Sequence, residues 1–344
     1  MRLISVIWLN YNSIHFIEEA KKSLESIFHL DYEPLEVIVV DNASTDGSDV
    51  EIQHLLTKQK TKWKFIKNDK NTGYAGGMNK GFEAVSEDSE YVIFVTNDVI
   101  AEPHGVKYAV EILEADTSLA CVQGYLLQPG GHIYSAGNWI DDLMGAGGIC
   151  QGLKPSDCAT LNKEHYVTYL DGAMLLCKKR IIKEVMGRPF VEETFAYLDD
   201  NILGLRLWNS GYKLLYIPVN FGIHLVSKTF GKRAEYYGLR SRLARMYAIR
   251  PCSTLTFVKL KYETGKYFYG SLRRSLEEAK RVAKAIISQM GVLYLKKAPH
   301  VHLTNIQTLS FGVPWVRTII RNIKKERGPI THEDLIELTL MDKN

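Results

Sequence analysis

Residues 91–98 read Tyr-Val-Ile-Phe-Val-Thr-Asn-Asp, an apolar run that stops abruptly at an amide and a carboxylate. The run has strand length and is rich in β-branched and aromatic residues, which is typical of a strand buried on both faces. In open α/β sheets, ligands bind beyond the carboxyl ends of such strands. Asp98 therefore has two interpretations: it holds a metal ion or a phosphate-bearing ligand, or it forms a turn or helix cap.

The N-terminal third of the chain alternates between short apolar runs and segments of helical periodicity. Four strands are expected, at residues 3–9, 35–40, 64–67 and 91–96. Helices are expected between them, over residues 16–28, from residue 48 to about residue 57, and over residues 74–85. This alternating order predicts an α/β fold with a Rossmann-like, mostly parallel sheet flanked by helices.

The second half is less regular. Strands are predicted at residues 119–127, 173–178 and 213–218, and helices from residue 180 and over 199–208. The glycine-rich segment 130–152 is expected to form loops or hairpins over the carboxyl edge of the sheet. Beyond about Lys228 the pattern becomes helical, basic and rich in tyrosine. We therefore expect a catalytic domain over residues 1–228 and a helical, basic C-terminal region over residues 229–344.

The composition is that of an ordinary soluble globular protein, with 46% hydrophobic and 24% charged residues among 344. No apolar stretch approaches the roughly 20 residues that span a bilayer. The run Leu3–Leu9 lacks a small-residue cleavage site and is interpreted as a strand, not as a signal peptide. The cysteines are five, scattered and without a CxxC motif, so we expect buried, reduced thiols in a cytoplasmic protein and no cysteine-based metal site.

Polar clusters also follow the first two predicted strands. The first strand ends in Asn10–Tyr11–Asn12, and the second is followed by Asp41–Asn42 and then by Asp46. An Asp at a strand end can accept hydrogen bonds from a ribose hydroxyl or from a base, as in nucleotide-binding folds. We favour ligand binding for Asp41, and an Asx-turn or a cap for Asp46.

A glycine-rich segment, residues 71–81, leads into the third predicted helix. It lacks the GK[ST] of a P-loop and is not a G-x-G-x-x-G motif. Small residues at a helix N-terminus can receive a phosphate or let a sugar approach the backbone. Each glycine inside a helix costs about 1 kcal/mol relative to alanine. The glycines therefore serve either close packing of the helix on the sheet or the approach of a ligand.

Two further positions carry titratable groups. Asp199 and Asp200 open a predicted helix, where they either favour the helix dipole or, in a cleft, supply a general base. His224 follows the strand that ends near Pro218, and it is either a structural histidine or a contact for a metal or phosphate.

Together, these motifs resemble glycosyltransferase family 2, with the GT-A fold, and most of all its rhamnosyltransferase-like branch. The resemblance lies in the order and spacing of the motifs and covers about residues 3–230. The matching segments are residues 6–12, 39–47, 71–81, 96–98, 172–180, 197–206 and 211–224.

The resemblance implies an inverting transferase that uses a nucleotide-diphosphate sugar, linked to UDP, dTDP or GDP. Asp41 would then recognise the base or ribose, and Asp98 and His224 would hold Mg²⁺ or Mn²⁺ against the diphosphate. Asp200 falls on the general base of inverting members. The implied donor-binding residues are Asn10, Tyr11, Asn12, Asp41, Asn42, Asn71, Gly73, Tyr74, Ala75, Asn79 and Asn97.

The chain departs from the family pattern at three positions. Asn97 stands where many members have Asp, which leaves one carboxylate for the metal. Ile202 stands where the branch usually has a second Asp. Asp199 replaces the usual Glu with a shorter side chain, so both Asp199 and Asp200 are candidates for the base.

Charge is unevenly distributed along the chain. From Val226 onward there are 23 Lys and Arg against 9 Asp and Glu, so this segment carries +14 and the preceding residues −10 of the overall +4. Residues 315–327 combine an apolar face with a basic face, the pattern of a helix lying on an anionic membrane surface. Residues 272–290 show a weaker form of it. Alternatively, both helices pack on the catalytic domain or on a second subunit of a homo-oligomer. Nucleic acid is not expected, because no base-reading module accompanies the charge.

The sequence thus predicts an inverting, metal-dependent glycosyltransferase that acts on a hydroxyl of a lipid-linked glycan at the cytoplasmic membrane face. A nucleotidyltransferase would need a glycine-rich loop with a basic residue after the first strand, and residues 10–12 offer none. A catalytically silent nucleotide-sugar-binding scaffold stays open because of Asn97 and Ile202.

Overall fold

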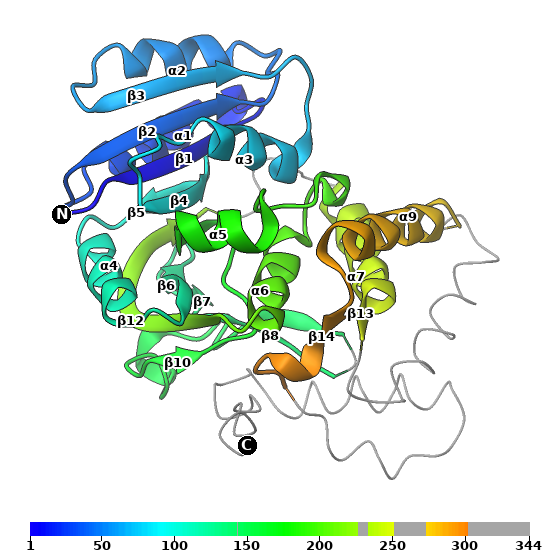
Figure 1. The fold of residues 1–344 in the computed structure, drawn as a ribbon. Helices are drawn as coiled ribbons and strands as arrows, with labels where there is room; N and C mark the ends of the chain where they lie inside the picture. Colours follow the sequence, from blue (N-terminus) through cyan, green and yellow to red (C-terminus); the bar gives the residue numbers. More distant parts are fainter. Residues whose placement is uncertain (143, 226–232, 251–272, 302–344) are drawn as a thin grey trace, which may run out of the picture.

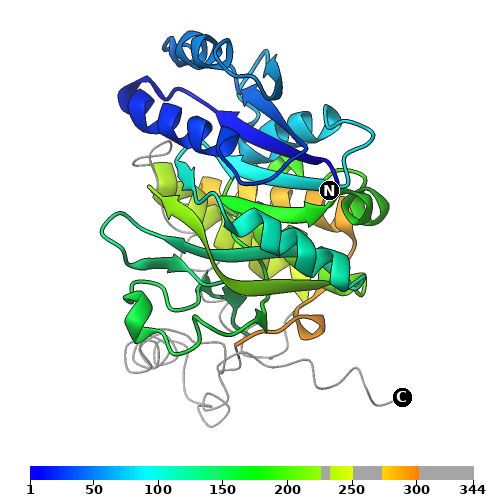
Figure 2. The ribbon, with the colours of Figure 1, turned by 90° about the vertical axis from the view of Figure 1, so that its left-hand side faces the viewer.

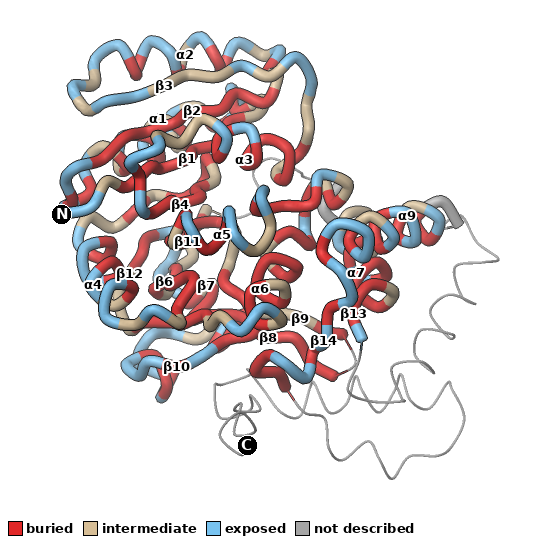
Figure 3. Tube along the Cα trace, viewed as in Figure 1, coloured by how far each residue is buried: buried red, intermediate tan, exposed pale blue. Residues whose placement is uncertain are grey.

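The computed structural model describes residues 1–142, 144–225, 233–250 and 273–301. Within these ranges, the main sheet has the strand order β10-β12-β6-β11-β4-β1-β2-β3, with β5 paired to β12 and β7 paired to β6 (Figure 1). The central strands are buried, whereas the outer faces of the surrounding helices are exposed (Figure 3). The predicted α/β class, with a sheet flanked by helices, is confirmed, and the sheet is mixed, with both parallel and antiparallel pairs.

Four parallel neighbours form the N-terminal half of the sheet. They are β1 (Ile4–Asn10), β2 (Leu35–Asp41), β3 (Lys62–Lys67) and β4 (Tyr91–Thr96). The register pairs Asn10 with Asp41 and Leu9 with Thr96. The polar residues that follow β1, β2 and β4 therefore meet at one edge of the sheet.

The other half of the sheet contains one reversal that matters for function. It consists of β5 (Val99–Ala101), β6 (Leu119–Leu127), β7 (Ile133–Ser135), β10 (His165–Tyr166), β11 (Met174–Lys178) and β12 (Lys213–His224). β11 runs antiparallel to both β4 and β6, while β6 and β12 are parallel. Residues that precede β11 therefore lie at the same edge as residues that follow β1 and β4.

β12 extends six residues beyond the predicted end at Pro218 and includes His224. Its pairing with β6 shifts register between Tyr216 and Asn220. Such an irregularity accommodates Pro218, which has no N–H to donate to the ladder.

Alternate residues of each strand contribute to two hydrophobic layers. Val6 and Trp8 face the layer with α1 (Ile17–Phe28), α2 (Ser48–Leu56) and α4 (Gly105–Ala115). Figure 2 looks onto this face, with α1 and α4 in front of the sheet. Ile7 and Leu9 face the layer with α3 (Gly73–Glu83), α5 (Lys179–Met186) and α6 (Asp199–Asn209).

The glycine-rich segment 130–152 forms hairpins, as predicted, and the remaining elements are short. β8 (Asn138–Ile140) pairs antiparallel with β9 (Ala146–Gly148). β13 (Ile249–Arg250) pairs with β14 (Leu293–Tyr294). The 3₁₀ turns are η1 (Ile14–Phe16), η2 (Pro155–Asp157), η3 (Glu192–Thr194) and η4 (Leu295–Lys297).

Two helices of the basic C-terminal region are described, α7 (Arg233–Ala248) and α9 (Arg273–Met290). Leu276, Val282 and Ile286 of α9 are buried in the same hydrophobic cluster as α6. For this helix the structure therefore favours packing on the catalytic domain over contact with a membrane. In the described part of the chain, no helix combines the length and apolarity needed to cross a bilayer. The predicted helix at residues 315–327 lies outside the described residues, and the boundary at residue 228 stays a prediction.

Four cysteines are disulfide-bonded, so the expectation of reduced thiols is wrong for them. Cys121 on β6 pairs with Cys177 on β11, where the antiparallel register places the two side by side. Cys150 pairs with Cys158 across a short loop. The spacing of cysteines along the chain does not reveal a pair that meets across two strands. Cys252 lies outside the described residues.

Close packing explains the glycines of residues 71–81. A Cβ at Gly77 would lie 2.5 Å from Leu9 Cδ1, and one at Gly81 would lie 2.3 Å from Ile7 Cγ2, so both let α3 approach β1. Gly73 has φ +72°, and its Cβ would lie 2.2 Å from the carbonyl oxygen of Phe195. Of the two interpretations, packing is the one that these contacts support.

Gly73→Ala should destabilise the protein more than Gly47→Ala. Both glycines have positive φ, but a Cβ at Gly47 meets no atom within 4 Å. The left-handed conformation alone costs alanine about 1–2 kcal/mol. At Gly73, overlap with the backbone of Phe195 should add about 1–3 kcal/mol. Urea unfolding of both variants measures the difference, and equal losses would show that the Phe195 loop moves aside at no cost.

Candidate functional site

A cavity of about 270 Å³ lies at the edge of the sheet where β1, β4 and β12 end and β11 begins. Side chains from all four strand ends, from the loop before α3 and from the loop before α6 line it. The lining residues are Leu9, Tyr11, Asn42, Asn71, Gly73, Tyr74, Thr96, Asn97, Asp98, Tyr134, Asp171, Gly172, Ala173, Phe195, Ala196, Tyr197, Asp199, Asp200, His224 and Tyr237.

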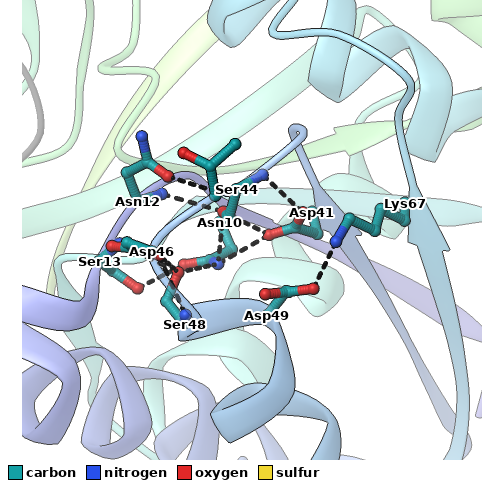
Figure 4. Close-up of polar contacts among 10 residues, drawn as sticks. Asn10, Asn12, Ser13, Asp41, Ser44, Asp46, Ser48, Asp49 and Lys67 are labelled. Carbon is teal, nitrogen blue, oxygen red and sulfur yellow. Dashed lines mark hydrogen bonds and ion pairs between the residues drawn. The ribbon is translucent and has the colours of Figure 1, made fainter.

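The buried amide of Asn10 joins the ends of β1, β2 and β4. Figure 4 shows its contacts on the β2 side. Its Nδ2 donates to Asp41 Oδ1 at 2.9 Å and lies 3.3 Å from the hydroxyls of Ser44 and Ser48. Its Oδ1 accepts a hydrogen bond of 3.2 Å from Asn97 Nδ2. Asn10 thus fixes the positions of its neighbours and does not itself line the cavity.

The structure places Asp41 inside this network. Besides the amide of Asn10, its carboxylate accepts the backbone N–H of Ser44 at 2.9 Å and the Ser44 hydroxyl at 2.6 Å. Asp41 is fully buried, and among the described residues these contacts engage both carboxylate oxygens. Asn12 likewise faces the network, because its Oδ1 accepts the N–H of Thr45 at 2.9 Å. Neither residue lines the cavity.

Asp46 has the turn role that the sequence favours. One of its oxygens accepts the N–H of Ser48 at 3.0 Å, directly before α2, and the other accepts the N–H of Ile14 at 2.9 Å (Figure 4). Burial raises the pKa of Asp46, but these hydrogen bonds outweigh it and the pKa lies below its ordinary value.

Asn42 holds the loop before α3 against the cavity. Its Nδ2 donates to Asn71 Oδ1 at 3.0 Å and to the carbonyl of Gly73 at 2.9 Å, and its Oδ1 accepts the N–H of Thr72 at 3.1 Å. The hydroxyl of Tyr74 then donates to the carbonyl of Gly172 at 2.8 Å, across the cavity wall. The predicted residues Tyr11, Asn42, Asn71, Gly73, Tyr74 and Asn97 therefore come together at the cavity.

Besides Asn10, Asn12 and Asp41, two more predicted donor-binding residues lie outside the cavity lining. Asn79 exchanges two hydrogen bonds with the backbone of Phe190, of 2.8 and 3.1 Å. Ala75 is fully buried in the layer between α3 and the sheet. Asn79 and Ala75 therefore contribute to the packing of α3.

Asp98 and His224 face each other across one wall. β5 follows Asp98 directly and pairs with β12 so that Val99 lies opposite His224. His224 Nε2 is 3.4 Å from Asp98 Oδ1, and Thr96 donates its hydroxyl to the same oxygen at 2.7 Å. Burial raises the pKa of Asp98, but the contacts with His224 and Thr96 bring it below its ordinary value. Burial lowers the pKa of His224, and Asp98 raises it above its ordinary value.

This pair fits a divalent cation. A carboxylate oxygen and an imidazole nitrogen suit Mn²⁺, and a cation bound to few protein ligands completes its shell with water or phosphate oxygens. Among the described residues, the buried Nδ1 of His224 has no hydrogen-bond partner. No group of three or more acidic, His or Cys side chains forms a closed metal site in the described part of the chain. Water or phosphate oxygens would therefore have to supply the remaining ligands.

Asp199 and Asp200 line the same cavity from the start of α6, in different environments. Asp199 is buried and accepts a hydrogen bond from the hydroxyl of Thr194, and burial raises its pKa. Asp200 is half-buried and accepts the N–H of Asn201 at 2.8 Å. Burial, then the charges of Asp171 and Asp199, raise the pKa of Asp200 to about 8. The raised pKa of Asp200 suits a carboxylate that accepts a proton near neutral pH.

Asp171 belongs to the cavity, and the sequence reasoning missed it. It precedes β11, and its Oδ1 accepts the N–H of Ala173 at 2.8 Å. Gln123 on β6 accepts the N–H of Asp171 at 2.9 Å and donates to its carbonyl at 2.8 Å. Burial raises the pKa of Asp171. The signal that could have found it is a carboxylate directly before the Gly172–Ala173 motif at the start of an apolar run.

Two arginines of α7, also missed, support the walls of the cavity. Arg240 is buried and donates to the carbonyls of Thr194 and Ala196, in the loop before α6. Arg245 is buried and donates to Asn201 Oδ1, and Asn201 Nδ2 lies 3.2 Å from Asp200 Oδ1. Both guanidinium groups are therefore buried and hydrogen-bonded to residues around the cavity, and they are not exposed to solvent.

The fold is that of the GT-A class of glycosyltransferases. The chain belongs to glycosyltransferase family 2, because the model of "Glycosyl transferase family 2" matches residues 5–182, half of the chain. The family resemblance predicted from the sequence is confirmed.

Three relatives with similar sequences are glycosyltransferases or polysaccharide synthases by name. An uncharacterized glycosyltransferase of Haemophilus influenzae is 32% identical over 126 residues, 36% of each chain. An N-acetylglucosaminyl-diphospho-decaprenol L-rhamnosyltransferase of Mycobacterium tuberculosis is 22% identical over 58% of this chain and 69% of its own. A poly-beta-1,6-N-acetyl-D-glucosamine synthase of Staphylococcus aureus is 28% identical over 64% of this chain and 49% of its own. The match thus spans about a third of the length of the Haemophilus relative.

Two solved structures share the fold. A mannosyltransferase of Pyrobaculum calidifontis in complex with GDP-Man and Mn²⁺ aligns with a TM-score of 0.51 and 18% identity, over 94% of this chain and 81% of its own. GalNAc-T7 with UDP, GalNAc and Mn²⁺ aligns with a TM-score of 0.58 and 12% identity, over 84% of this chain and 56% of its own.

Asp171→Asn should lower the pKa of Asp200. The negative charge of Asp171 disfavours the charged form of Asp200, so its removal moves the titration from about 8 toward the ordinary value of 3.8. The titration can be followed by ¹³C NMR of the aspartate carboxyl carbons between about pH 4 and 9. Asp88→Asn, at an exposed position, is the control and should leave the Asp200 titration in place. An unchanged titration in Asp171→Asn would contradict the coupling.

Proposed function

We propose that this chain is a metal-assisted, inverting glycosyltransferase that transfers a sugar from a nucleotide-diphosphate sugar to a hydroxyl of a glycan acceptor. One observation carries the proposal. The Asp98–His224 pair and Asp200, a carboxylate whose pKa is raised to about 8, line a single cavity and come from different elements.

The donor would lie along the loop before α3. Tyr11, Asn42, Asn71 and Asn97 present polar groups to the cavity and suit the ribose and base. In this proposal Asp41 acts on the donor through the network that positions Asn97, and not by contact. Asp98 and His224 would hold Mg²⁺ or Mn²⁺. When bound, the cation would supply positive charge to the leaving diphosphate.

Asp200 would take the proton of the acceptor hydroxyl. That oxygen forms a bond to the anomeric carbon as the bond from this carbon to the diphosphate oxygen breaks. The proton goes to the Asp200 carboxylate, and the nucleoside diphosphate leaves with the electron pair. In this proposal the base and the diphosphate-binding pair approach the anomeric carbon from opposite sides, so the hydroxyl attacks the face opposite the leaving group and the configuration is inverted.

The names of the relatives support a glycan acceptor. One relative is named for a lipid-linked sugar, N-acetylglucosaminyl-diphospho-decaprenol, and another for a polysaccharide. We extend this to a lipid-linked glycan reached at the cytoplasmic face of a membrane. The basic face of residues 315–327 would bind anionic lipid there.

A donor screen followed by a transfer assay tests the proposal. UDP-, dTDP- and GDP-sugars are added with Mn²⁺, and stabilisation is measured by thermal shift. The sugar that stabilises most is then incubated with a panel of glycosides, and the anomeric configuration of the product is read by ¹H NMR. Stabilisation without transfer or donor hydrolysis would identify a silent binder. A product with retained configuration would contradict the assignment of Asp200.

Asp98→Asn should abolish the Mn²⁺-dependent part of donor binding while the fold stays intact. The substitution keeps the shape of the side chain and removes the carboxylate of the proposed metal site. Calorimetric titration of the best nucleotide sugar, with Mn²⁺ and with EDTA, measures the effect. Asp88→Asn is the control, since Asp88 is exposed. Equal Mn²⁺ dependence in Asp98→Asn and the wild type would refute the metal assignment.

Asp200→Asn should lower kcat by about 10²-fold or more with little change in donor affinity, as expected for loss of a general base. Asp199→Asn should lower it less, because Asp199 is bound to Thr194 and more deeply buried. Steady-state transfer rates of the two variants decide the ranking. The reverse order would make Asp199 the base.

A further inference from the structure

A second, larger cavity of about 880 Å³ adjoins the first. Its lining residues come from the loop before α3, the η3 turn and the two C-terminal helices α7 and α9. Asn71, Phe195 and Tyr237 line both cavities. Its full lining is Lys70, Asn71, Thr72, Glu192, Glu193, Phe195, Tyr236, Tyr237, Arg240, Glu278 and Arg281.

The shared wall is aromatic and held in place. The rings of Phe195 and Tyr237 are stacked, with centroids 5.4 Å apart and planes at 21°. The carbonyl of Phe195 accepts the N–H of Tyr74 at 2.7 Å. Arg240 lies 4.9 Å from the centre of the Tyr237 ring. Phe195 and Tyr197 have φ of +59° and +71°. Such backbone strain persists where the surroundings enforce it, and it is concentrated at functional sites.

The charges of the second cavity balance. Three cationic and three anionic side chains line it: Lys70, Arg240, Arg281, Glu192, Glu193 and Glu278. A diphosphate or an anionic lipid headgroup would face three carboxylates there, and repulsion would offset the attraction of the cations. A neutral ligand with many hydroxyl groups meets no such penalty, because each hydroxyl both donates and accepts hydrogen bonds.

Hydrogen-bonding groups remain available in this cavity. Tyr236 donates its hydroxyl to Glu278 Oε2 at 2.5 Å, so a phenol and a carboxylate lie together in the lining. Lys70 and Arg281 are exposed, and neither makes a hydrogen bond or ion pair with the residues that the structure describes. Polar groups of both kinds beside flat aromatic rings fit a sugar, whose C–H face packs on a ring while its hydroxyls bond to the charged groups.

We propose that the second cavity binds a neutral sugar unit of the acceptor glycan, at least one position away from the sugar whose hydroxyl reacts. The inference rests on the proposed function, because it assumes that transfer occurs in the first cavity. The acceptor then passes the Phe195–Tyr237 wall and occupies both cavities. The acceptor class is therefore an oligosaccharide, and any lipid diphosphate follows at least two sugars.

Saturation-transfer NMR tests this with the full chain, Mn²⁺ and saturating UDP or GDP, whichever stabilises the protein. The probes are neutral oligosaccharides: cellobiose, gentiobiose, chitobiose and the matching trisaccharides, each compared with its monosaccharide. We expect at least one oligosaccharide to bind about tenfold more tightly than its monosaccharide. The preference should survive about 0.5 M salt, because screening weakens ionic but not neutral recognition.

Glu278→Gln and Arg281→Gln should each remove this preference. Glu277→Gln and Lys284→Gln are the matched controls, since both side chains lie on α9 but outside the cavity lining, and they should keep it. Melting temperatures check the fold of each variant. The inference is overturned if no oligosaccharide is preferred, if the preference survives both cavity substitutions, or if salt abolishes it.

The two proposals fail in different ways. A wild-type protein that binds no nucleotide sugar contradicts the proposed function. A wild-type protein that binds a nucleotide sugar and transfers to monosaccharides and oligosaccharides equally well contradicts only the role of the second cavity.

Discussion

The candidate site depends on one buried amide, that of Asn10. It links the end of β1 to Asp41 after β2 and to Asn97 after β4. A buried polar group without a hydrogen-bond partner costs about 1–3 kcal/mol. Separating the three strand ends would leave these buried groups without partners, so their hydrogen bonds hold the strand ends together.

The same network explains why residue 97 is an asparagine. The amide of Asn97 donates a hydrogen bond to Asn10 Oδ1. An aspartate at position 97 would instead place a carboxylate oxygen against Asn10 Oδ1, and two acceptors would face each other unless the Asn10 amide rotated by 180°. The single carboxylate at the proposed metal site is thus coupled to the network beneath it.

The site is assembled from parts of the chain that are far apart in sequence. The strand ends supply the wall with Asp98, and the reversed strand β11 brings Asp171 to the same edge. The start of α6 supplies Asp200. α7 then holds this second wall through Arg240 and Arg245, which donate to the loop before α6 and to Asn201. The C-terminal helices therefore take part in shaping the cavity, although residues 5–182 alone carry the family match.

Much of this fold could be predicted from the sequence, because buried parallel strands are continuous apolar runs and end at polar residues. Looking for a polar residue directly after an apolar run identified Asp98 as a candidate, because its strand β4 is parallel to β1. It failed for Asp171, because β11 is antiparallel and its polar residue comes before the apolar run, not after it. Pattern could not decide whether Asp41 contacts a ligand or a neighbour, since both roles need the same carboxylate at a strand end. The net charge of the C-terminal segment also does not tell which arginines are buried, so Arg240 and Arg245 could not be distinguished from exposed arginines of the same segment.

The central claim is that one cavity holds a cation against Asp98 and His224 while Asp200 lines the same cavity as the base. A crystal structure with Mn²⁺ and the preferred nucleoside diphosphate tests this most directly, through the anomalous scattering of manganese. The account predicts an anomalous peak within about 2.5 Å of both Asp98 and His224, with the diphosphate on the same ion and Asp200 across the cavity. A nucleotide bound elsewhere, or a manganese ion that contacts neither residue, would contradict it.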